Sequence, residues 1–363
     1  MGKYRTDLLL AATASPSASG TRTIDLDISQ PISRIEITYK TTKASEGMSA
    51  PAPANIPKVE LVEGSTPLHS LTGYTNQALA YYSRNHVAME HGQHIGSLSE
   101  VDMYVIDFGR FLWDPLYAFD PKRFKNPQLK ITYNRAVSDT SVTVDSMEIW
   151  AHVFDEKTIS PMGFLKAIEV WSGSFLADNS VNEILLPEDE VIRQLLVRAH
   201  YDGYEPWYQV DIAKLDEAAN GHVIFDYQDL EMFYRRMKSQ WPMLQVPLQI
   251  APNTSSGRYY YIAPSDYYAG INMIPIQATG ELYMGGAGAK GGKVNPISNT
   301  AVQYVGRAFG YLPWSTFQFA LGDQQNPDDW YDPAGKKPRL RLTSNTAGTS
   351  GDGNVVIETV KKY

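Results

Sequence analysis

The sequence predicts an all-β protein that contains two tandem copies of one antiparallel sandwich. Three observations support this fold class. The chain of 363 residues contains 23 Tyr, 27 Gly and 22 Pro, a composition that favours strands and turns. Several short segments alternate apolar with polar residues, as half-buried strands do. In addition, segments of the first half recur in the second half in the same order.

The elements expected within each copy follow from local patterns. In the first copy, strands are predicted over Thr23–Ile28, Arg34–Tyr39 and Gln128–Tyr133, because apolar residues occupy every second position. Pro and Gly separate such segments at intervals that suit an antiparallel sandwich of about eight strands. Leu71–Arg84 and Phe225–Met237 each contain apolar residues three positions apart, which predicts one short helix per copy.

Five pairs of similar segments carry the evidence for duplication. Their offsets run from 160 through 151 and 152 to 201 and 211 residues. The pairs are Ile32–Ile37 with Ile192–Val197 (with Ile24 and Leu26 against Ile184 and Leu186), Val59–Leu61 with Val210–Ile212, Ala78–Arg84 with Leu230–Arg236, Phe108–Trp113 with Phe309–Trp314, and Lys125–Asn134 with Lys336–Asn345. Five colinear matches with slowly changing offsets indicate that one domain was duplicated.

The offsets also predict the domain organisation. The offset between matching segments increases from 152 to 201 residues, which predicts an insertion of 49 residues in the second copy, between Arg236 and Phe309. The expected parts are an N-terminal arm over residues 1–20, a first sandwich over 21–155, a linker over 156–174, and a second sandwich over 175–363 with inserted loops at about 239–300. The arm has the basic, apolar and small residues of a loose signal-peptide pattern, but a mobile arm that orders on a neighbour is favoured.

Composition excludes several classes of function. The chain has no Cys, so disulfides, thiol catalysis and Cys-based zinc sites are excluded. Its net charge of −8 opposes a broad nucleic-acid-binding surface, since such surfaces neutralise phosphates with Lys and Arg. No run approaches the ~20 apolar residues that span a bilayer. We therefore expect no specific nucleic acid as a partner.

Two motifs resemble cofactor or metal sites. Gly286-x-Gly288-x-x-Gly291 has the spacing of a dinucleotide fingerprint, but the residues that follow do not read as the helix which that chemistry requires, so a surface loop is favoured. His86, Glu90, His91 and His94 place four metal-ligating side chains within nine residues. The segment contains Gly and reads as a connection, and a polar loop is favoured over a metal site.

Other charged motifs have ordinary structural interpretations. Asp328, Asp329 and Asp332 lack the spacing of a calcium loop, so an Asp-rich turn is favoured over a calcium site or paired carboxylates. Phe233–Lys238 combines three cations with aromatic residues and is read as a solvated face. Asn253 begins a glycosylation sequon, which matters only in a secretory host. The sequence thus predicts no catalytic, cofactor-binding or metal-binding residues, and not an enzyme.

The duplicated β architecture, the length and the lack of a catalytic pattern resemble the double jelly-roll major capsid proteins of icosahedral viruses, particularly tailless phages with an internal membrane. The resemblance covers about Thr21 to Val360. It implies two jelly-roll β-sandwiches in tandem, with Pro127 and Pro338 in equivalent late strands. Because loops of the first copy look short, an outer tower would come mainly from the second.

The resemblance also implies a function and partners. Three chains would form a homotrimer in which six similar barrels surround the axis, giving a pseudo-hexameric capsomer of an icosahedral shell. The implied partners are neighbouring capsomers, penton or minor capsid proteins, and an internal membrane reached through the N-terminal arm. The implied location is the virion capsid, with assembly in the host cell cytoplasm.

A carbohydrate-binding β-sandwich protein or a glycosidase is the alternative function. Trp207, Trp241 and Trp330 would then stack on sugars from one open face. The position of the tryptophans discriminates between the two functions. If Trp113 and Trp314 occupy equivalent positions in the two copies, they are core residues of the repeated unit.

Overall fold

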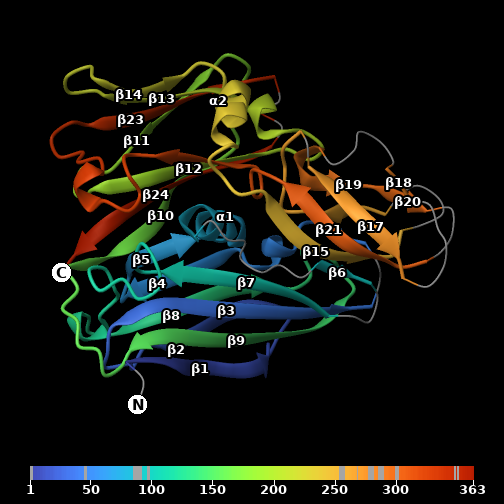
Figure 1. Ribbon diagram of the computed structural model, residues 1–363, viewed down its shortest axis with the longest axis horizontal. Coiled ribbons are helices and arrows are strands. Elements are labelled where there is room, and N and C mark those ends of the chain that lie inside the picture. The colour runs from blue at the N-terminus through green and yellow to red at the C-terminus, as the bar shows by residue number, and fades with distance from the viewer. Residues whose placement is uncertain are drawn as a thin grey trace.

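The computed structural model describes most of the 363 residues. The described ranges are 3–44, 47–84, 92–95, 99–252, 258–267, 269–276, 282–284, 290–298, 302–346, 349 and 351–363. The chain folds into two β-sandwiches side by side, with further strands gathered at one end of the molecule (Figure 1). Among the described residues, no helix is long and apolar enough to cross a membrane.

The first sandwich consists of eight strands in two groups of four. These are β1 (Tyr4–Ala14), β2 (Ser19–Asp25), β3 (Ile32–Lys43), β4 (Lys58–Glu63), β5 (Thr66–Leu71), β7 (Ser99–Asp107), β8 (Pro127–Asn134) and β9 (Val142–Phe154). One sheet has the order β1-β9-β3-β7, and the facing strands have the order β2-β8-β4-β5. Apolar side chains from both groups, such as Ile35, Ile37, Leu61 and Leu129, form one buried core.

The second sandwich repeats this arrangement strand for strand. Its strands are β10 (Gly163–Gly173), β11 (Val181–Leu185), β12 (Ile192–His200), β13 (Val210–Glu217), β14 (Val223–Tyr227), β22 (Thr316–Ala320), β23 (Pro338–Ser344) and β24 (Asp352–Lys362). The two groups have the orders β10-β24-β12-β22 and β11-β23-β13-β14, which match those of the first sandwich position by position. The predicted fold class, two jelly rolls in tandem with short helices and an insertion in the second, is therefore confirmed.

The equivalence of the two barrels extends to local irregularities. Strand β3 has a bulge between Ile32 and Arg34 against β9, and β12 has the same bulge between Ile192 and Gln194 against β24. Bulges are specific local features, so a shared position indicates a common origin. The backbone N–H of residue 26 donates to the carbonyl of residue 127 at 3.0 Å, and that of residue 186 donates to residue 338 at 3.0 Å. The predicted equivalence of the two prolines is confirmed.

Two of the five sequence pairs need correction. Val59–Leu61 and Val210–Ile212 lie in equivalent strands. In the first barrel Val59 pairs with Ile131, and in the second barrel Leu342, the counterpart of Ile131, pairs with Ala213. Val59 therefore corresponds to Ala213 and not to Val210. The sequence alignment is therefore three residues out of register there. The shift is an odd number of residues because β13 has a bulge between Val210 and Ile212, after which Ala213 and Leu215 take the buried positions that Val59 and Leu61 take in β4.

The pairing of Phe108–Trp113 with Phe309–Trp314 is wrong. Phe108 directly follows β7, whereas Phe309 lies in β21 (Tyr304–Gly310), a strand of the insertion. The backbone N–H of Phe108 donates to the carbonyl of residue 33, and that of Leu321 donates to the equivalent residue 193. Leu321 is thus the counterpart of Phe108, and the shared Phe-Gly dipeptide is a coincidence of composition.

The insertion is longer than predicted and forms strands. Seventy-eight residues separate α2 (Leu230–Met237) from β22, against 14 between α1 (Gly73–Arg84) and β7. The inserted strands are β15 (Leu244–Ile250), β16 (Tyr260–Tyr261), β17 (Gly270–Pro275), β18 (Leu282–Met284), β19 (Lys293–Val294), β20 (Pro296–Ser298) and β21. One sheet has the order β17-β21-β15-β6, in which β6 (Gly92–His94) comes from the first half of the chain. Both halves therefore contribute to this end of the molecule, opposite the C-terminus (Figure 1).

The expected arm and linker are largely strands. Residues 4–14 form β1, which pairs antiparallel with β9, and Leu9 and Leu10 pack against the first core. Arg5 also bonds Asp155 at 2.6 Å, so this segment is an edge strand of the first barrel and not an arm. Residues 163–173 form β10, which pairs with β24, so the connection between the barrels shortens to residues 155–162.

Strand β10 joins the two barrels into one sheet. It pairs in parallel with β5 at Ile168 and Ser70, which makes an eight-stranded sheet that runs through both barrels. Short 3-10 helices fill several connections: η1 (Ala52–Asn55), η2 (Pro121–Arg123), η3 (Pro206–Tyr208), η4 (Lys290–Gly292) and η5 (Pro327–Asp329). The relative position of the barrels therefore depends on this strand pair and on the side chains packed beside it.

Candidate functional site at the junction of the two barrels

The glycine and histidine motifs lie mostly outside the described residues. Gly286 and Gly288 are outside them, as are His86, Glu90 and His91, and only the backbone of His94 is described, in β6. Asn253 is also outside them. Among the side chains that the structure does describe, no group of three or more His, Asp or Glu is placed to hold a metal ion.

The acidic and basic motifs lie on the surface. Asp328 and Asp329 are exposed in η5, whose first turn is capped by the Asn326 side chain. Asp332 is exposed and caps a turn by accepting from the backbone N–H of Ala334 at 3.1 Å. These carboxylates form turns, as expected. In α2, Phe233 is buried while Arg235 is exposed and bonds Glu231 at 2.6 Å, so the basic motif is a solvated helix face.

The tryptophans named for sugar binding do not form an open platform. Trp207, Trp241 and Trp330 are 6%, 8% and 5% exposed. A stacking surface needs aromatic faces that a sugar can reach, so these residues do not favour the carbohydrate-binding alternative. Trp113 and Trp314 lie in connections that are not equivalent, and therefore they are not repeated core residues of the unit.

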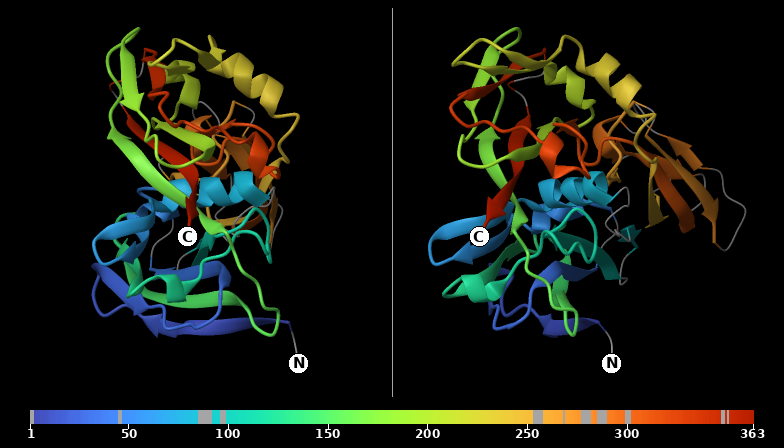
Figure 2. Two further views of the ribbon diagram at one scale, coloured as in Figure 1. Left: turned by 90° about the vertical axis from the view of Figure 1, so that its left-hand side faces the viewer. Right: turned by 60° about the vertical axis from the view of Figure 1, so that its left-hand side comes forward.

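Helix α1 separates the two barrels and contacts both (Figure 2). On one side, the Asn76 side chain bonds the backbone of Val105 in β7 twice, at 2.9 and 2.8 Å. On the other side, the indole N–H of Trp314 donates to the Gln77 side chain at 2.7 Å, and the Tyr82 hydroxyl donates to the carbonyl of Thr316 at 2.7 Å. Because these groups are buried, their bonds fix how one barrel sits against the other.

The sequence of α1 explains its buried position. The helix has no charged residue before Arg84 at its end, and most of its side chains are buried. Its counterpart α2 carries Glu231, Arg235 and Arg236 and has one face in solvent. Charged side chains are almost never fully buried without a partner, so only the first helix is suited to the space between barrels. At its start, the Thr72 hydroxyl accepts from the backbone N–H of Thr75 at 3.2 Å.

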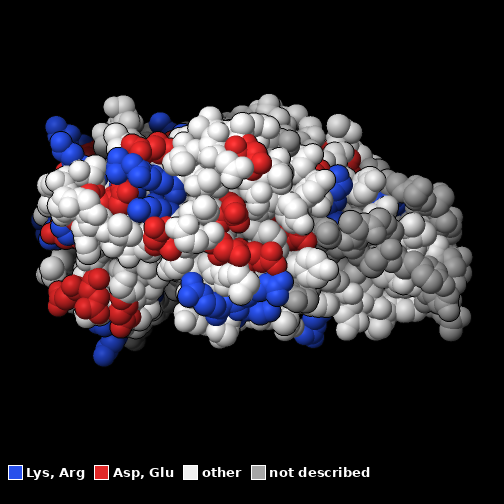
Figure 3. Space-filling model, turned by 90° about the horizontal axis from the view of Figure 1, so that it is seen from above, with Lys and Arg blue, Asp and Glu red and all other residues white. Residues whose placement is uncertain are grey.

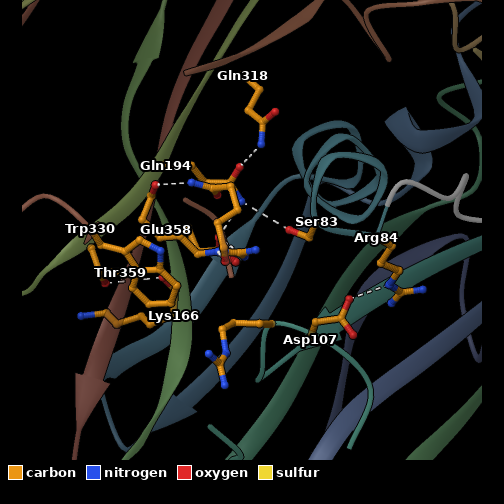
Figure 4. A network of polar contacts seen from close by, with 12 residues as sticks. Ser83, Arg84, Asp107, Lys166, Gln194, Gln318, Trp330, Glu358 and Thr359 are labelled. Carbon is orange, nitrogen blue, oxygen red and sulfur yellow. Dashed lines mark hydrogen bonds and ion pairs between the residues drawn. The ribbon is translucent and has the colours of Figure 1, made fainter. Parts of the chain in front are cut away.

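A buried polar network lies on the face of the second barrel that meets α1 (Figure 4). Arg193 of β12 forms an ion pair with Glu358 of β24 at 2.8 Å, and their side chains are 1% and 4% exposed. Gln194 donates to the same carboxylate at 2.5 Å and contacts the Ser83 hydroxyl of α1 at 3.3 Å. Gln318 of β22 donates to the Gln194 side chain. The network thus joins three strands of one barrel to the helix of the other.

Further contacts lie beside this network, one set within the first barrel and one across the junction. Asp107 accepts from Arg34 and from Arg84 at 2.6 Å each, which links the end of α1 to β3 and β7. The guanidinium of Arg198, which is 4% exposed, lies 4.3 Å from the ring centroid of Tyr74 in α1. Such cation–π contacts gain strength when water is excluded. The junction therefore combines hydrogen bonds, ion pairs and aromatic packing, and its arrangement is structural.

These junction residues were not predicted, although the sequence contains a signal for them. Arg193, Gln194 and Arg198 interrupt the otherwise apolar stretch of β12, and Glu358 interrupts the apolar stretch of β24. Polar residues inside a strand that is buried on both faces require partners from a neighbouring element. The burial of both faces of β12 is visible only once the two barrels are placed together.

His69 of β5 provides a pH-dependent test of this junction. Burial lowers the pKa of His69 to about 3 from its usual value of 6.5, and its Nε2 has no hydrogen-bond partner among the described residues. As pH falls below 6.5 the unfolded chain binds a proton there while the folded chain does not, so stability is lost down to about pH 3. The slope for one such group is about 1.4 kcal/mol per pH unit.

The matching experiment compares His69→Leu with the wild-type chain. We expect urea unfolding between pH 6.5 and 3 to show a smaller loss of stability in the variant, because leucine takes up no proton in either state. The acidic residues titrate in both proteins, so their contribution cancels in the difference between the two free energies of unfolding. Parallel curves for the two proteins would contradict the assignment of a neutral, buried His69.

Comparisons with known proteins agree with the fold described above. No family model and no curated protein sequence matches the chain. Among solved structures, the STIV major capsid protein is similar with a TM-score of 0.61 at 11% identity, over 99% of this chain and 96% of that one. The major capsid protein P2 from bacteriophage PM2 has a TM-score of 0.56 at 11% identity, over 99% and 98%.

A third structure, PBCV-1 VP54, has a TM-score of 0.57 at 10% identity, over 98% of this chain and 93% of that one. The likeness extends over nearly the full length of each chain, so both barrels and their order are shared. At these identities the likeness establishes the fold. The chain has the double jelly-roll architecture, as the resemblance in the sequence implied.

Proposed function

We propose that the chain is a structural virion protein, a major capsid protein whose homotrimers form the pseudo-hexameric capsomers of an icosahedral shell. The observation that carries this proposal is the strand-for-strand repetition of one jelly roll within a single chain. Three chains around a three-fold axis supply six similar barrels, which approximate six-fold symmetry with closed cyclic contacts. The barrels in this proposal comprise residues 4–154 and 163–362.

The junction between the barrels supports a rigid building block. A capsomer needs barrels held at a fixed angle, and α1 with the buried Arg193–Glu358 pair holds them in one position. The inserted strands lie at the end opposite the C-terminus (Figure 1). In the proposed shell this end would form the outer projection of each chain, and the opposite end would face inward. Each trimer would then have three projections, one from each chain.

The proposed partners are the other copies of this chain, neighbouring capsomers, and penton or minor capsid proteins. The proposed location is the virion, after assembly in the host cell cytoplasm. The contact with an internal membrane needs revision, because residues 4–14 belong to β1.

The mass of the purified protein in solution tests the trimer. Sedimentation equilibrium at micromolar concentration should give three times the chain mass of 40.5 kDa. Obligate interfaces of this type bury roughly 2,000–5,000 Å², so the trimer should persist on dilution. A stable monomer over the same concentration range would contradict the proposal.

A further inference from the structure

Two equivalent connections of the barrels carry opposite charge. The connection over residues 108–126, here called the basic loop, joins β7 to β8, and the connection over 321–337, the acidic loop, joins β22 to β23. The basic loop contains Arg110, Lys122, Arg123 and Lys125 with Asp114 and Asp120, and the acidic loop contains Asp323, Asp328, Asp329 and Asp332 with Lys336 and Lys337. The basic loop, with four cations and two anions, has a net charge of +2, and the acidic loop, with two cations and four anions, has a net charge of −2.

Equivalent backbone hydrogen bonds show which residues of the two loops correspond to each other. Phe108 and Leu321 are counterparts, because their N–H groups donate to the equivalent carbonyls of residues 33 and 193 at 3.1 and 3.0 Å. Isolated bridges pair Ile32 with Phe119 and the equivalent Ile192 with Tyr331. Counting from these anchors, Arg110 corresponds to Asp323, and Tyr117 corresponds to Asp329.

The two loops contact each other within the chain. Arg110 of the basic loop donates from Nη1 to the carbonyl of Gln325 at 2.7 Å. Tyr117 stacks on Trp330 with ring centroids 5.9 Å apart, and both rings belong to a small buried cluster. The contacting side of the basic loop is thus the side that carries Arg110 and Tyr117. On the acidic loop, the corresponding side carries Asp323 and Asp329.

The carboxylates on this side of the acidic loop have no cation as a partner in the described part of the chain, and that of Asp323 accepts only from the backbone N–H of Gln325 at 2.8 Å. Asp323 and Asp329 are exposed and form no ion pair with any described residue. On the basic loop, Lys122 and Lys125 are exposed and likewise form no ion pair in the described part of the chain. On the face seen in Figure 3, Lys and Arg lie beside Asp and Glu. Several charged side chains elsewhere in the described part of the chain form ion pairs, for example Arg339 with Asp216 and Arg341 with Glu183.

We propose that the acidic loop docks on the basic loop of a second copy of this chain. The contact repeats between chains what the two loops already do within one chain, since the barrel that follows in the ring is the first barrel of a neighbour. Asp323 and Asp329 then face the basic loop of the neighbour, whose exposed Lys122 and Lys125 form no ion pair in the described part of the chain. This inference rests on the proposed trimer and names the surface that closes it.

A charge-swap experiment with the full-length chain tests the contact. One variant reverses the acidic side (Asp323→Lys with Asp329→Lys), a second reverses the basic side (Lys122→Glu with Lys125→Glu), and a third combines all four. Asp178→Lys with Asp226→Lys makes the same change of charge at exposed residues outside both loops and serves as the control. The readout is the dissociation constant of the trimer by sedimentation at low and high salt, with circular dichroism to confirm folding.

We expect each reversal to weaken the trimer about 10-fold or more at low salt, because like charges then face each other across the contact. The variant with all four substitutions should recover most of the lost affinity between chains, and the control should assemble like the wild type. High salt should reduce these differences, since exposed charges are screened. The loop contact would be overturned, and the trimer left intact, if both two-residue variants assemble like the wild type. The same conclusion would follow if the variant with all four substitutions dissociates as readily as either two-residue variant. A wild-type chain that is monomeric would overturn the trimer itself.

Discussion

Replacing Arg193 with Met should lower the free energy of unfolding by about 3–5 kcal/mol, because it leaves the buried Glu358 carboxylate without its cation. The carboxylate would keep the hydrogen bond from Gln194, which does not offset the lost charge. Urea unfolding at pH 7 measures the change. Since the pair lies where α1 meets the second barrel, we also expect the trimer of this variant to dissociate at lower urea.

The control for this prediction replaces both partners. Arg193→Met combined with Glu358→Leu removes the ion pair and leaves apolar side chains of similar size, which in other proteins is often neutral or stabilising. We therefore expect the double variant to be more stable than Arg193→Met alone. A single variant as stable as the wild type would show that the ion pair contributes nothing to the junction.

Removing residues 1–14 should lower the free energy of unfolding by about 2–4 kcal/mol and promote aggregation. The deletion removes β1, whose Leu9 and Leu10 pack against the first core. It also leaves β9 as an exposed edge with unpaired backbone groups, which can pair with other chains. Urea unfolding and light scattering measure the two effects.

A shorter deletion provides the control. Removal of residues 1–2 leaves all of β1 in place and also keeps Lys3, whose carbonyl accepts the backbone N–H groups of Asp155 and Lys157, so the chain should unfold like the full-length protein. If the 1–14 deletion unfolds at the same urea concentration as the full chain and stays soluble, β1 is not part of the barrel. The expectation that residues 1–20 form a mobile arm that orders on a neighbour would then regain support.

Much of the fold could be predicted because duplication leaves a signal in the sequence. The apolar positions of β3 and β12 match at a constant offset, and those of β8 and β23 match at the proline that begins each strand. Each match constrains the other, so a duplicated sandwich of about eight strands could be predicted from weak local patterns, whereas the order of the strands in the sheets is given only by the structure. The short helices were also expected at their observed places.

The errors have physical causes that can be traced to particular residues. β1 was read as an arm because several of its outward positions are small or polar, and only its pairing with β9 shows that it is a strand. The junction network was missed because a buried Arg193 makes sense only beside Glu358, 165 positions away. Long-range partners of this kind are not encoded in local periodicity.

Electron microscopy of the purified oligomer, averaged along its symmetry axis, tests the proposed trimeric capsomer. We expect a three-fold particle with a hexagonal outline formed by six barrels, with three projections at one end. Particles with two-fold symmetry, or single two-barrel units without higher order at micromolar concentration, would contradict it.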